Sequence, residues 1–494
     1  MGRVPPKEPG NRRLLTMLAA LVGVVLLAGC ARESGGTSAP AGAPETTAGT
    51  AQERLAPTRA ETSSPAEGAT GAVGSTAGSG ERAQLTPKAE GAPSYAYTYG
   101  DPSGDRLVRG WGWLPGSEPV DVGLSGEPAW VVGTPLGDDV AWVVALEDGR
   151  IEAFRHDTGS GSVRPWPVSP DRLPALAPPA VAVEGEQLRL LATGGGASAS
   201  THPVPVSPGE ASRGSLVVAE DGGLFVEREG SFAPVGEPQE VRALPDARAA
   251  RALDGRLAVL TEPTGRYAHG VIGDDLEAEG ITVLEPTDAG LEVAGRVFAE
   301  SGGVFELVSP LWFEGPDGRE LLAVTESAEG LGSRIAVYDP EEGLLAAGPF
   351  FGEPQRWRHL LAAGPFGPNG EVEVAAIRTP HIGGVVEFYG IDAEAGKLRI
   401  TAAQPGYSSH KIYSRNLDAA RAGDLDGDGA FELLVPSQDG TELGAVQRVE
   451  GGANVAWTLP VGGVLATNLA ATAAPDGRVA VAAGREGGAL RIWP

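Results

Sequence analysis

The sequence predicts an all-β fold, a β-propeller of seven four-stranded blades preceded by a signal peptide and a disordered linker. Gly (73 residues) and Pro (41) are abundant among the 494 residues, which disfavours long helices. Short apolar runs alternate with polar turns throughout residues 95–494, as strands joined by tight hairpins do. Seven of these runs follow a glycine-containing turn, and the six intervals between Gly137 and Gly477 average about 57 residues.

Each repeat is expected to hold two hairpins, because a second polar turn, such as 157–159, follows several of the runs. Two hairpins make a four-stranded sheet, the unit of a propeller blade. Two stacked β-sandwich domains are the alternative, but even spacing without a linker favours one ring. The last repeat shows three strands, so segment 94–108 is expected to supply the fourth and close the ring. The seven runs are 141–146, 188–192, 257–260, 321–324, 372–377, 431–435 and 479–483.

The first thirty residues carry a targeting pattern. A basic start precedes an apolar stretch over 14–27, which is too short to span a bilayer, and Ala28, Gly29 and Cys30 follow. Residues 27–30 resemble the lipobox of bacterial lipoproteins. That resemblance implies a signal peptide over 1–29, acylation of Cys30 and anchorage in a bacterial membrane, facing the periplasm or exterior. In a cell with two membranes it favours the outer one. An uncleaved anchor or a chance cysteine is the alternative.

Composition separates a tether from the folded domain and excludes several functions. Residues 30–94 are mostly Gly, Ala, Ser, Thr and Pro and are expected to be disordered, whereas residues 95–494 hold all the aromatic side chains. The chain has 65 acidic and 38 basic residues, a net charge of −27, so it repels phosphate backbones and nucleic acid is not an expected partner. One cysteine excludes a disulfide framework and a Cys-rich zinc site. We expect a monomer.

One nine-residue turn has the pattern of a cation-binding loop. Asp424, Asp426, Asp428 and Glu432 supply carboxylates at alternating positions, and the Ala430 carbonyl completes a set of oxygens that suits Ca²⁺. No helices flank the loop, which excludes an EF-hand. The block resembles the calcium loop of FG-GAP/VCBS-type propeller repeats, which implies a structural Ca²⁺. An acidic turn without metal is the alternative.

Two other repeats bear on the fold alone. Residues 364–374 align with 423–433 after a shift of 59 positions, but proline and glycine replace the first two Asp ligands, so one complete calcium loop is expected. Residues 153–159, followed by Trp166, resemble the repeat of quinoprotein-like propellers more weakly. This second resemblance does not imply a quinone cofactor.

Three of the six histidines fall within 52 residues, together with arginine and aromatic side chains. In a propeller, the loops from the fourth strand to the next blade and those between the second and third strands open on one face, so these residues are expected to meet there. The calcium loop is expected on the opposite face. The arginines suit an anion, the aromatics a sugar and the histidines a metal, while local hydrogen bonds to the loops are the plain alternative. The candidate residues are Trp357, Arg358, His359, Arg378, His381, Tyr407, His410, Arg415 and Asp418.

The predicted function is a membrane-tethered, extracytoplasmic binding or scaffold module, stabilised by calcium, for a protein or a small anionic or carbohydrate ligand. The alternative is an extracytoplasmic enzyme that uses the His/Arg/Tyr cluster on an acidic or sugar substrate. No nucleophile elbow, P-loop, zinc-protease motif or dinucleotide fingerprint occurs, so no catalytic residue is assigned. An insertion at 262–280, with Arg266, Tyr267 and His269, is expected to form a lid or a contact loop on the same face.

Overall fold

The computed structural model describes residues 95–96, 112–191, 196–207, 213–236, 241–352, 355–474 and 476–494, all within the unit Arg82–Pro494. The predicted signal peptide, Cys30 and the tether lie outside the described residues, so lipidation and disorder stay predictions. Strands dominate, with two short 3-10 turns, η1 (Leu114–Gly116) and η3 (Glu300–Gly302). No helix in this part of the chain is long and apolar enough to cross a membrane.

Seven antiparallel four-stranded groups, blades 1 to 7, recur along the described chain. Blade 1 consists of β3 (Pro128–Leu136), β4 (Asp139–Leu146), β5 (Ile151–His156) and β6 (Val163–Pro165). Blade 2 consists of β10 (Val204–Pro205), β11 (Ser215–Val218), β12 (Leu224–Arg228) and β13 (Ser231–Pro234). Blade 3 consists of β14 (Ala250–Arg251), β15 (Leu257–Thr264), β16 (Glu277–Pro286) and β17 (Leu291–Phe298). Blade 4 consists of β19 (Leu311–Glu314), β20 (Glu320–Ala328), β21 (Gly332–Asp339) and β22 (Gly343–Ala347).

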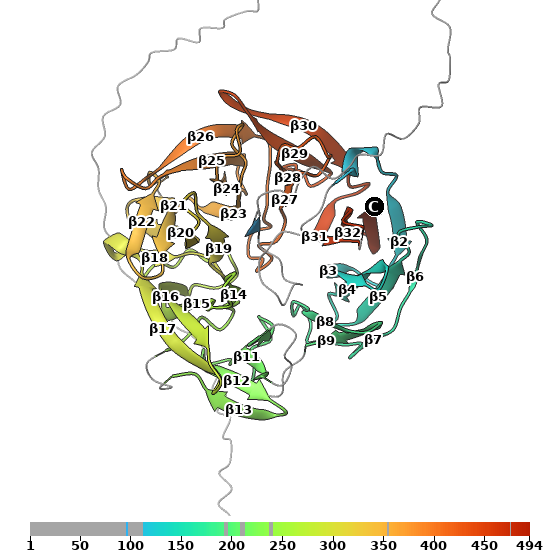
Figure 1. Ribbon diagram of the computed structural model, residues 1–494, viewed down its shortest axis with the longest axis horizontal. Helices are drawn as coiled ribbons and strands as arrows, with labels where there is room; N and C mark the ends of the chain where they lie inside the picture. Colours follow the sequence, from blue (N-terminus) through green and yellow to red (C-terminus); the bar gives the residue numbers. More distant parts are fainter. Residues whose placement is uncertain are drawn as a thin grey trace, which may run out of the picture. The chain divides into compact units, whose positions relative to one another are not determined.

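Blade 5 consists of β23 (Arg358–Gly364), β24 (Glu373–Arg378), β25 (Val385–Asp392) and β26 (Lys397–Pro405). Blade 6 consists of β27 (Arg421–Gly423), β28 (Glu432–Pro436), β29 (Glu442–Val449) and β30 (Gly452–Pro460). Blade 7 is β31 (Leu465–Ala473), β32 (Val479–Arg485), β33 (Ala489–Trp493) and β2 (Val120–Gly123). The short strand β18 (Val304–Phe305) links blades 3 and 4 by pairing with β16 and β20. Within this unit the sheets follow one another around a central axis (Figure 1). The fold is a β-propeller, as predicted.

The ring closes differently from the prediction. Strand β2 pairs with β33, with Val120 opposite Ile492, and supplies the fourth strand of blade 7. The assignment of 94–108 to this place is wrong: its described part, β1 (Tyr95–Ala96), pairs instead with the innermost strand of blade 5. The pattern of β2 explains the choice, since its two valines alternate with Asp121, which forms ion pairs with Arg485 and Arg491.

The second predicted repeat is also misplaced. Its run 188–192 begins in a three-stranded sheet between blades 1 and 2, made of β7 (Val168–Ser169), β8 (Val181–Glu184) and β9 (Gln187–Leu190). The four-stranded blade 2 that follows was not predicted. Its strands are short, and one whole additional sheet therefore fits between Gly185 and Gly255, which the even spacing assigned to consecutive repeats.

The seven predicted turns have the backbone that such tight turns require. Their glycines, listed by position as 137, 185, 255, 318, 370, 429 and 477, have φ between 62° and 97°, a region that side chains disfavour. Six of these turns join the first two strands of a blade, and the turn at Gly185 joins β8 to β9 in the three-stranded sheet. These turns therefore mark one side of the ring, here the hairpin face, while the connections between blades and the second-to-third strand connections mark the loop face.

The core lies between neighbouring blades. Inner strands such as β4 and β24 are almost continuously buried, whereas the outer strand β30 alternates partly buried and exposed residues, as a sheet edge facing water does. Trp142, Trp312 and Trp493 are fully buried, and burial of each large side chain contributes about 1.5–3 kcal/mol. This packing between neighbouring blades supports the loops and turns on the two faces.

Candidate functional site

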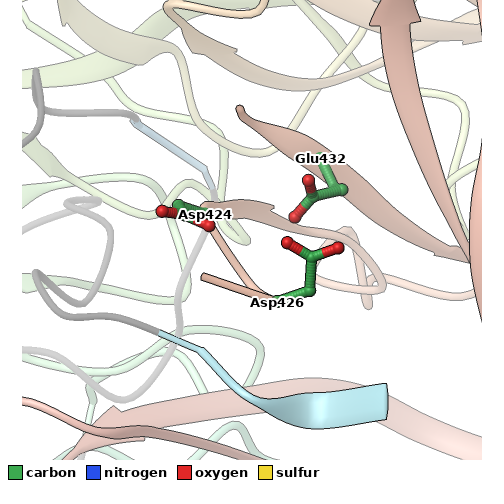
Figure 2. Close-up of side chains that lie close together, drawn as sticks. All are labelled: Asp424, Asp426 and Glu432. Atoms are coloured by element: carbon green, nitrogen blue, oxygen red, sulfur yellow. The ribbon is translucent and has the colours of Figure 1, made fainter. Parts of the chain in front are cut away.

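The turn between β27 and β28 on the hairpin face gathers carboxylates. Ligand oxygens of Asp424, Asp426 and Glu432 lie within 4.8 Å of one another, and Figure 2 shows the Asp426 and Glu432 carboxylates turned toward each other. The turn is held by its own amides, because Gly427 N and Gly429 N donate to the two Asp424 oxygens at 2.8 and 3.1 Å. The sequence therefore builds a compact acidic loop that can hold a metal ion.

The two other predicted ligands lie in the same turn. Asp428 accepts hydrogen bonds from Ala430 N at 2.7 Å and from Gln447 Nε2 at 3.3 Å, so its carboxylate stands beside the three-residue cluster rather than inside it. The segment that precedes β2 also forms backbone hydrogen bonds with this loop. Gly112 N donates to the Asp424 carbonyl at 3.0 Å, and Leu114 N, on a fully buried residue, donates to the Leu425 carbonyl at 3.1 Å.

Glu432 is the buried member of this cluster, with none of its surface exposed. Its carboxylate accepts hydrogen bonds from Leu425 N (2.9 Å) and Gln447 Nε2 (3.1 Å), but no arginine or lysine of the described chain forms an ion pair with it. Burial, together with the charges of the three Asp residues of the loop, raises its pKa to about 9 in the absence of metal.

The incomplete loop of blade 5 shows how the same position is neutralised without metal. Glu373 begins β24 as Glu432 begins β28, and it is also buried. There Arg448 Nε lies 2.8 Å from Glu373 Oε2, so a guanidinium supplies the positive charge. Blade 6 has the Asp ligands and lacks the arginine, which is what a cation-binding version of this turn requires.

The three predicted histidines do come together on the loop face. His381 Nε2 lies 2.7 Å from His410 Nδ1, and the rings of His359 and His410 are 5.7 Å apart. The Trp357 ring stacks on His359, with centroids 4.8 Å apart, and His359 Nδ1 lies 2.7 Å from Ser409 Oγ. Topology thus predicted the meeting of residues separated by about 50 positions.

His359 and His410 are buried, His381 is half-buried in the cavity wall, and all three are uncharged at neutral pH. Burial lowers the pKa of His381 to about 4 and that of His410 to about 3, and it lowers the pKa of His359 well below its ordinary value. Their nitrogens do not converge on one point. Within the described part of the chain, the Asp424 cluster is the one set of three carboxylate or imidazole ligands within 4.8 Å.

The predicted arginines are already paired with carboxylates. Arg358 and Arg378 both donate to Glu387, at 3.0 and 2.7 Å, and Arg415 donates to Asp246 at 3.0 Å. The geometry therefore does not assemble a three-arginine anion fork. Asp418 likewise pairs with Arg421 at 3.0 Å, beneath the same face. Trp357 and Tyr407 are buried, so neither ring is open to stack on a sugar.

The predicted insertion forms a strap, residues 265–276, across the loop face. Tyr413 N donates to the Val271 carbonyl at 2.9 Å, and Arg415 donates to Asp274 at 2.9 Å. These contacts join blade 3 to the connection between blades 5 and 6, which lies elsewhere in the ring (Figure 1). Five of the six described non-glycine residues with positive φ lie on this face, where strained backbone often accompanies function. They are Leu176, Glu262, Gln355, Thr379 and Tyr413.

A half-open cavity of about 780 Å³ lies on the loop face. His381 and His410 line it, and so do residues that the sequence reasoning missed: Trp130 of blade 1, Leu176 and Tyr413. Tyr413 is 70% exposed and Leu176 61%, although both are large apolar residues. The run Lys-Ile-Tyr at 411–413, inside a loop of small polar residues, was the available signal.

Comparisons with known proteins find distantly similar solved structures and no family. No family model matches the sequence, and no curated protein matches it. Three solved structures are similar at 11–15% identity: a Lactobacillus plantarum protein (TM-score 0.37, 75% of this chain and 96% of that one), a proposed 6-phosphogluconolactonase from Bacteroides uniformis (0.38, 76% and 97%) and the β-propeller domain of Cps50 (Swd1) from Myceliophteria thermophila (0.38, 75% and 96%). These values indicate nothing about activity.

Proposed function

We propose that the protein is an extracytoplasmic binding module, a β-propeller tethered to a bacterial membrane through Cys30, stabilised by Ca²⁺ on its hairpin face and binding a protein partner on its loop face. The cavity carries the binding part of the proposal, because large apolar side chains stand exposed around it. The lipobox resemblance supports the tether. The uncompensated Glu432 carboxylate supports the calcium.

The chemistry of the rim favours a protein over a sugar or a small anion. The aromatic rings that a sugar requires are buried, and the arginines that an anion requires are paired. Tyr413, Ile412 and Leu176 instead present the large, exposed apolar surface that protein interfaces use as anchors. The enzyme alternative is supported by the hydrogen-bonded pair of His381 and His410 in the cavity wall, but the Ser409 hydroxyl that lies 2.7 Å from His359 Nδ1 is buried.

Removing the apolar rim is expected to abolish partner binding. In a pull-down from detergent-solubilised membranes, the variant Ile412→Ser/Tyr413→Ala should lose a protein that the unmodified chain recovers, since central aromatic anchors cost about 2 kcal/mol or more when truncated. The control is Ile400→Ser on β26, which is 42% exposed but belongs to an outer strand. Recovery of the same proteins by both variants would contradict the loop-face interface.

Calcium is expected to raise the melting temperature of the chain. A ligand that binds only the folded state stabilises it by about 2.7 kcal/mol at a hundred times its Kd. Asp426→Asn should abolish the difference between chelated and calcium-loaded samples in a thermal melt, because it removes a ligand without changing the turn's size. Glu373→Gln is the matched control, since that glutamate has an arginine partner, and the calcium effect should persist in it. Equal melting temperatures with and without Ca²⁺ in the unmodified chain would refute the site.

A further inference from the structure

Most buried carboxylates in the described part of this ring form an ion pair with an arginine, and three of them do not. Nine Asp or Glu residues are buried in the described chain, and six of them form an ion pair with an arginine. The six are Asp246, Glu326, Asp339, Glu373, Glu387 and Asp418. The exceptions are Glu432, which belongs to the proposed calcium loop, and the pair Glu277 and Glu306.

Glu277 and Glu306 lie next to each other on the loop face. Ala278 in β16 pairs with Phe305 in β18, and extending this antiparallel register by one residue sets Glu277 opposite Glu306. Residues directly opposite in such a pair lie on the same side of the sheet, with Cβ atoms about 4.5–5.5 Å apart. Both side chains are 0% exposed. Two like charges at this position are strongly unfavourable unless something neutralises them.

The surroundings supply donors to Glu306 and none to Glu277. Ser327 Oγ donates to one oxygen of Glu306, and His269 Nδ1 contacts the other. Neither oxygen of Glu277 has a hydrogen-bond partner among the described residues. Burial and the neighbouring charge of Glu306 raise the pKa of Glu277 to about 11, so this carboxyl group is expected to carry a proton at neutral pH unless a cation lies beside it.

Tyr267, on the strap, brings a hydroxyl to the same place. It is buried, and its pKa is raised by burial and by the charges of Glu306 and Glu277, so it lies near both carboxylates. The strap therefore covers a pocket of oxygen donors: two carboxylates and the hydroxyls of Tyr267 and Ser327. Hard oxygen donors with a charge of −2 match a divalent cation such as Ca²⁺, Mg²⁺ or Mn²⁺.

We propose that Glu277 and Glu306 hold a divalent cation beneath the strap, at a second site independent of the Asp424 loop. The ion satisfies the two oxygens of Glu277 and takes the role that arginine plays at the other buried carboxylates. Tyr267 and His269 belong to the strap, so the ion also fixes the segment that Val271 and Asp274 join to the cavity rim. A shared proton between the two glutamates is the competing account.

Isothermal titration of the metal-free full chain tests this site. The variant Asp424→Asn/Asp426→Asn lacks the hairpin-face ligands and is titrated separately with Ca²⁺, Mg²⁺ and Mn²⁺. We expect one bound ion per chain for at least one of the three metals. Adding Glu277→Gln should reduce this to none, while Tyr267→Phe should weaken binding about tenfold. Glu326→Gln, a buried glutamate of the same region with an arginine partner, should leave the stoichiometry at one.

The outcomes separate this proposal from the calcium loop. No binding of any of the three metals by Asp424→Asn/Asp426→Asn overturns the second site and supports the shared proton, whatever the unmodified chain binds. Binding that survives Glu277→Gln also overturns it. Because Glu277→Gln replaces a buried carboxyl group by an uncharged amide of the same size, it should fold, and circular dichroism of the variant checks this.

Discussion

Glu387→Ala is expected to lower the free energy of unfolding by about 3–5 kcal/mol, because it strands a buried positive charge. Arg358 is 2% exposed, and its Nε donates to Glu387 at 3.0 Å. The same carboxylate accepts from Arg378 at 2.7 Å and from the Tyr389 hydroxyl at 2.6 Å. Removing it leaves the Arg358 guanidinium in the protein interior without its carboxylate partner.

Urea unfolding at constant m-value measures this loss. The control is Glu486→Ala, whose carboxylate pairs with Lys411 at 3.4 Å while both side chains are largely exposed. That change should stay within about 0.5 kcal/mol. A loss below about 1 kcal/mol for Glu387→Ala would mean that water reaches Arg358, and that the buried ion pair does not organise blade 5.

Glu432 and Glu277 are expected to lower the stability of the metal-free chain as the pH rises from 6 to 8, while the buried histidines oppose them below about pH 7 because their unfolded forms bind a proton there. The pKa of Glu432 is about 9 in the folded chain against an ordinary value of 4.5, and that of Glu277 is raised in the same direction. Between these values the unfolded chain has released the proton that the folded chain still holds. Each such group therefore removes about 1.4 kcal/mol of stability per pH unit.

Two glutamine variants and added Ca²⁺ separate the contributions of Glu432 and Glu277 to this dependence on pH. Glu432→Gln and Glu277→Gln should each reduce the slope of unfolding free energy against pH by about 1.4 kcal/mol per unit, and the double variant by about twice that. Saturating Ca²⁺ should weaken the dependence on pH, since the metal replaces the proton on Glu432. The readout is urea unfolding at pH 6, 7 and 8. A slope that neither variant changes would show that the two carboxylates are hydrated.

The parts of the fold that local chemistry determines could be predicted. Tight turns need glycine at positive φ, so a turn such as that at Gly370 or Gly429 is readable from a few residues, and a regular series of them indicates the ring. Blade 2 escaped, and the three-stranded sheet was taken for a full blade, because strands of two to five residues leave little pattern. The closing strand escaped because its partner lies some 370 positions away, a distance that spacing does not encode.

The candidate sites divide in the same way. The Asp424 loop fits within nine residues, and the meeting of His359, His381 and His410 follows from blade topology alone. The ion-pair partners of the candidate arginines could not be predicted. Arg358 finds Glu387 29 positions away and Arg415 finds Asp246 169 positions away, so long-range pairing decides which charges remain available.

The docking of Gly112 and Leu114 on the Asp424 turn has a mechanical meaning. A tension that arrives along the chain from the N-terminal side meets the pairing of β1 with β23, then these two backbone hydrogen bonds, before it reaches β2. The acidic turn therefore acts as a clamp just ahead of the ring closure, and the pairing of Asp121 with Arg485 and Arg491 acts as the next one. An ion that stiffens this turn would set how hard the propeller can be pulled before its ring begins to open.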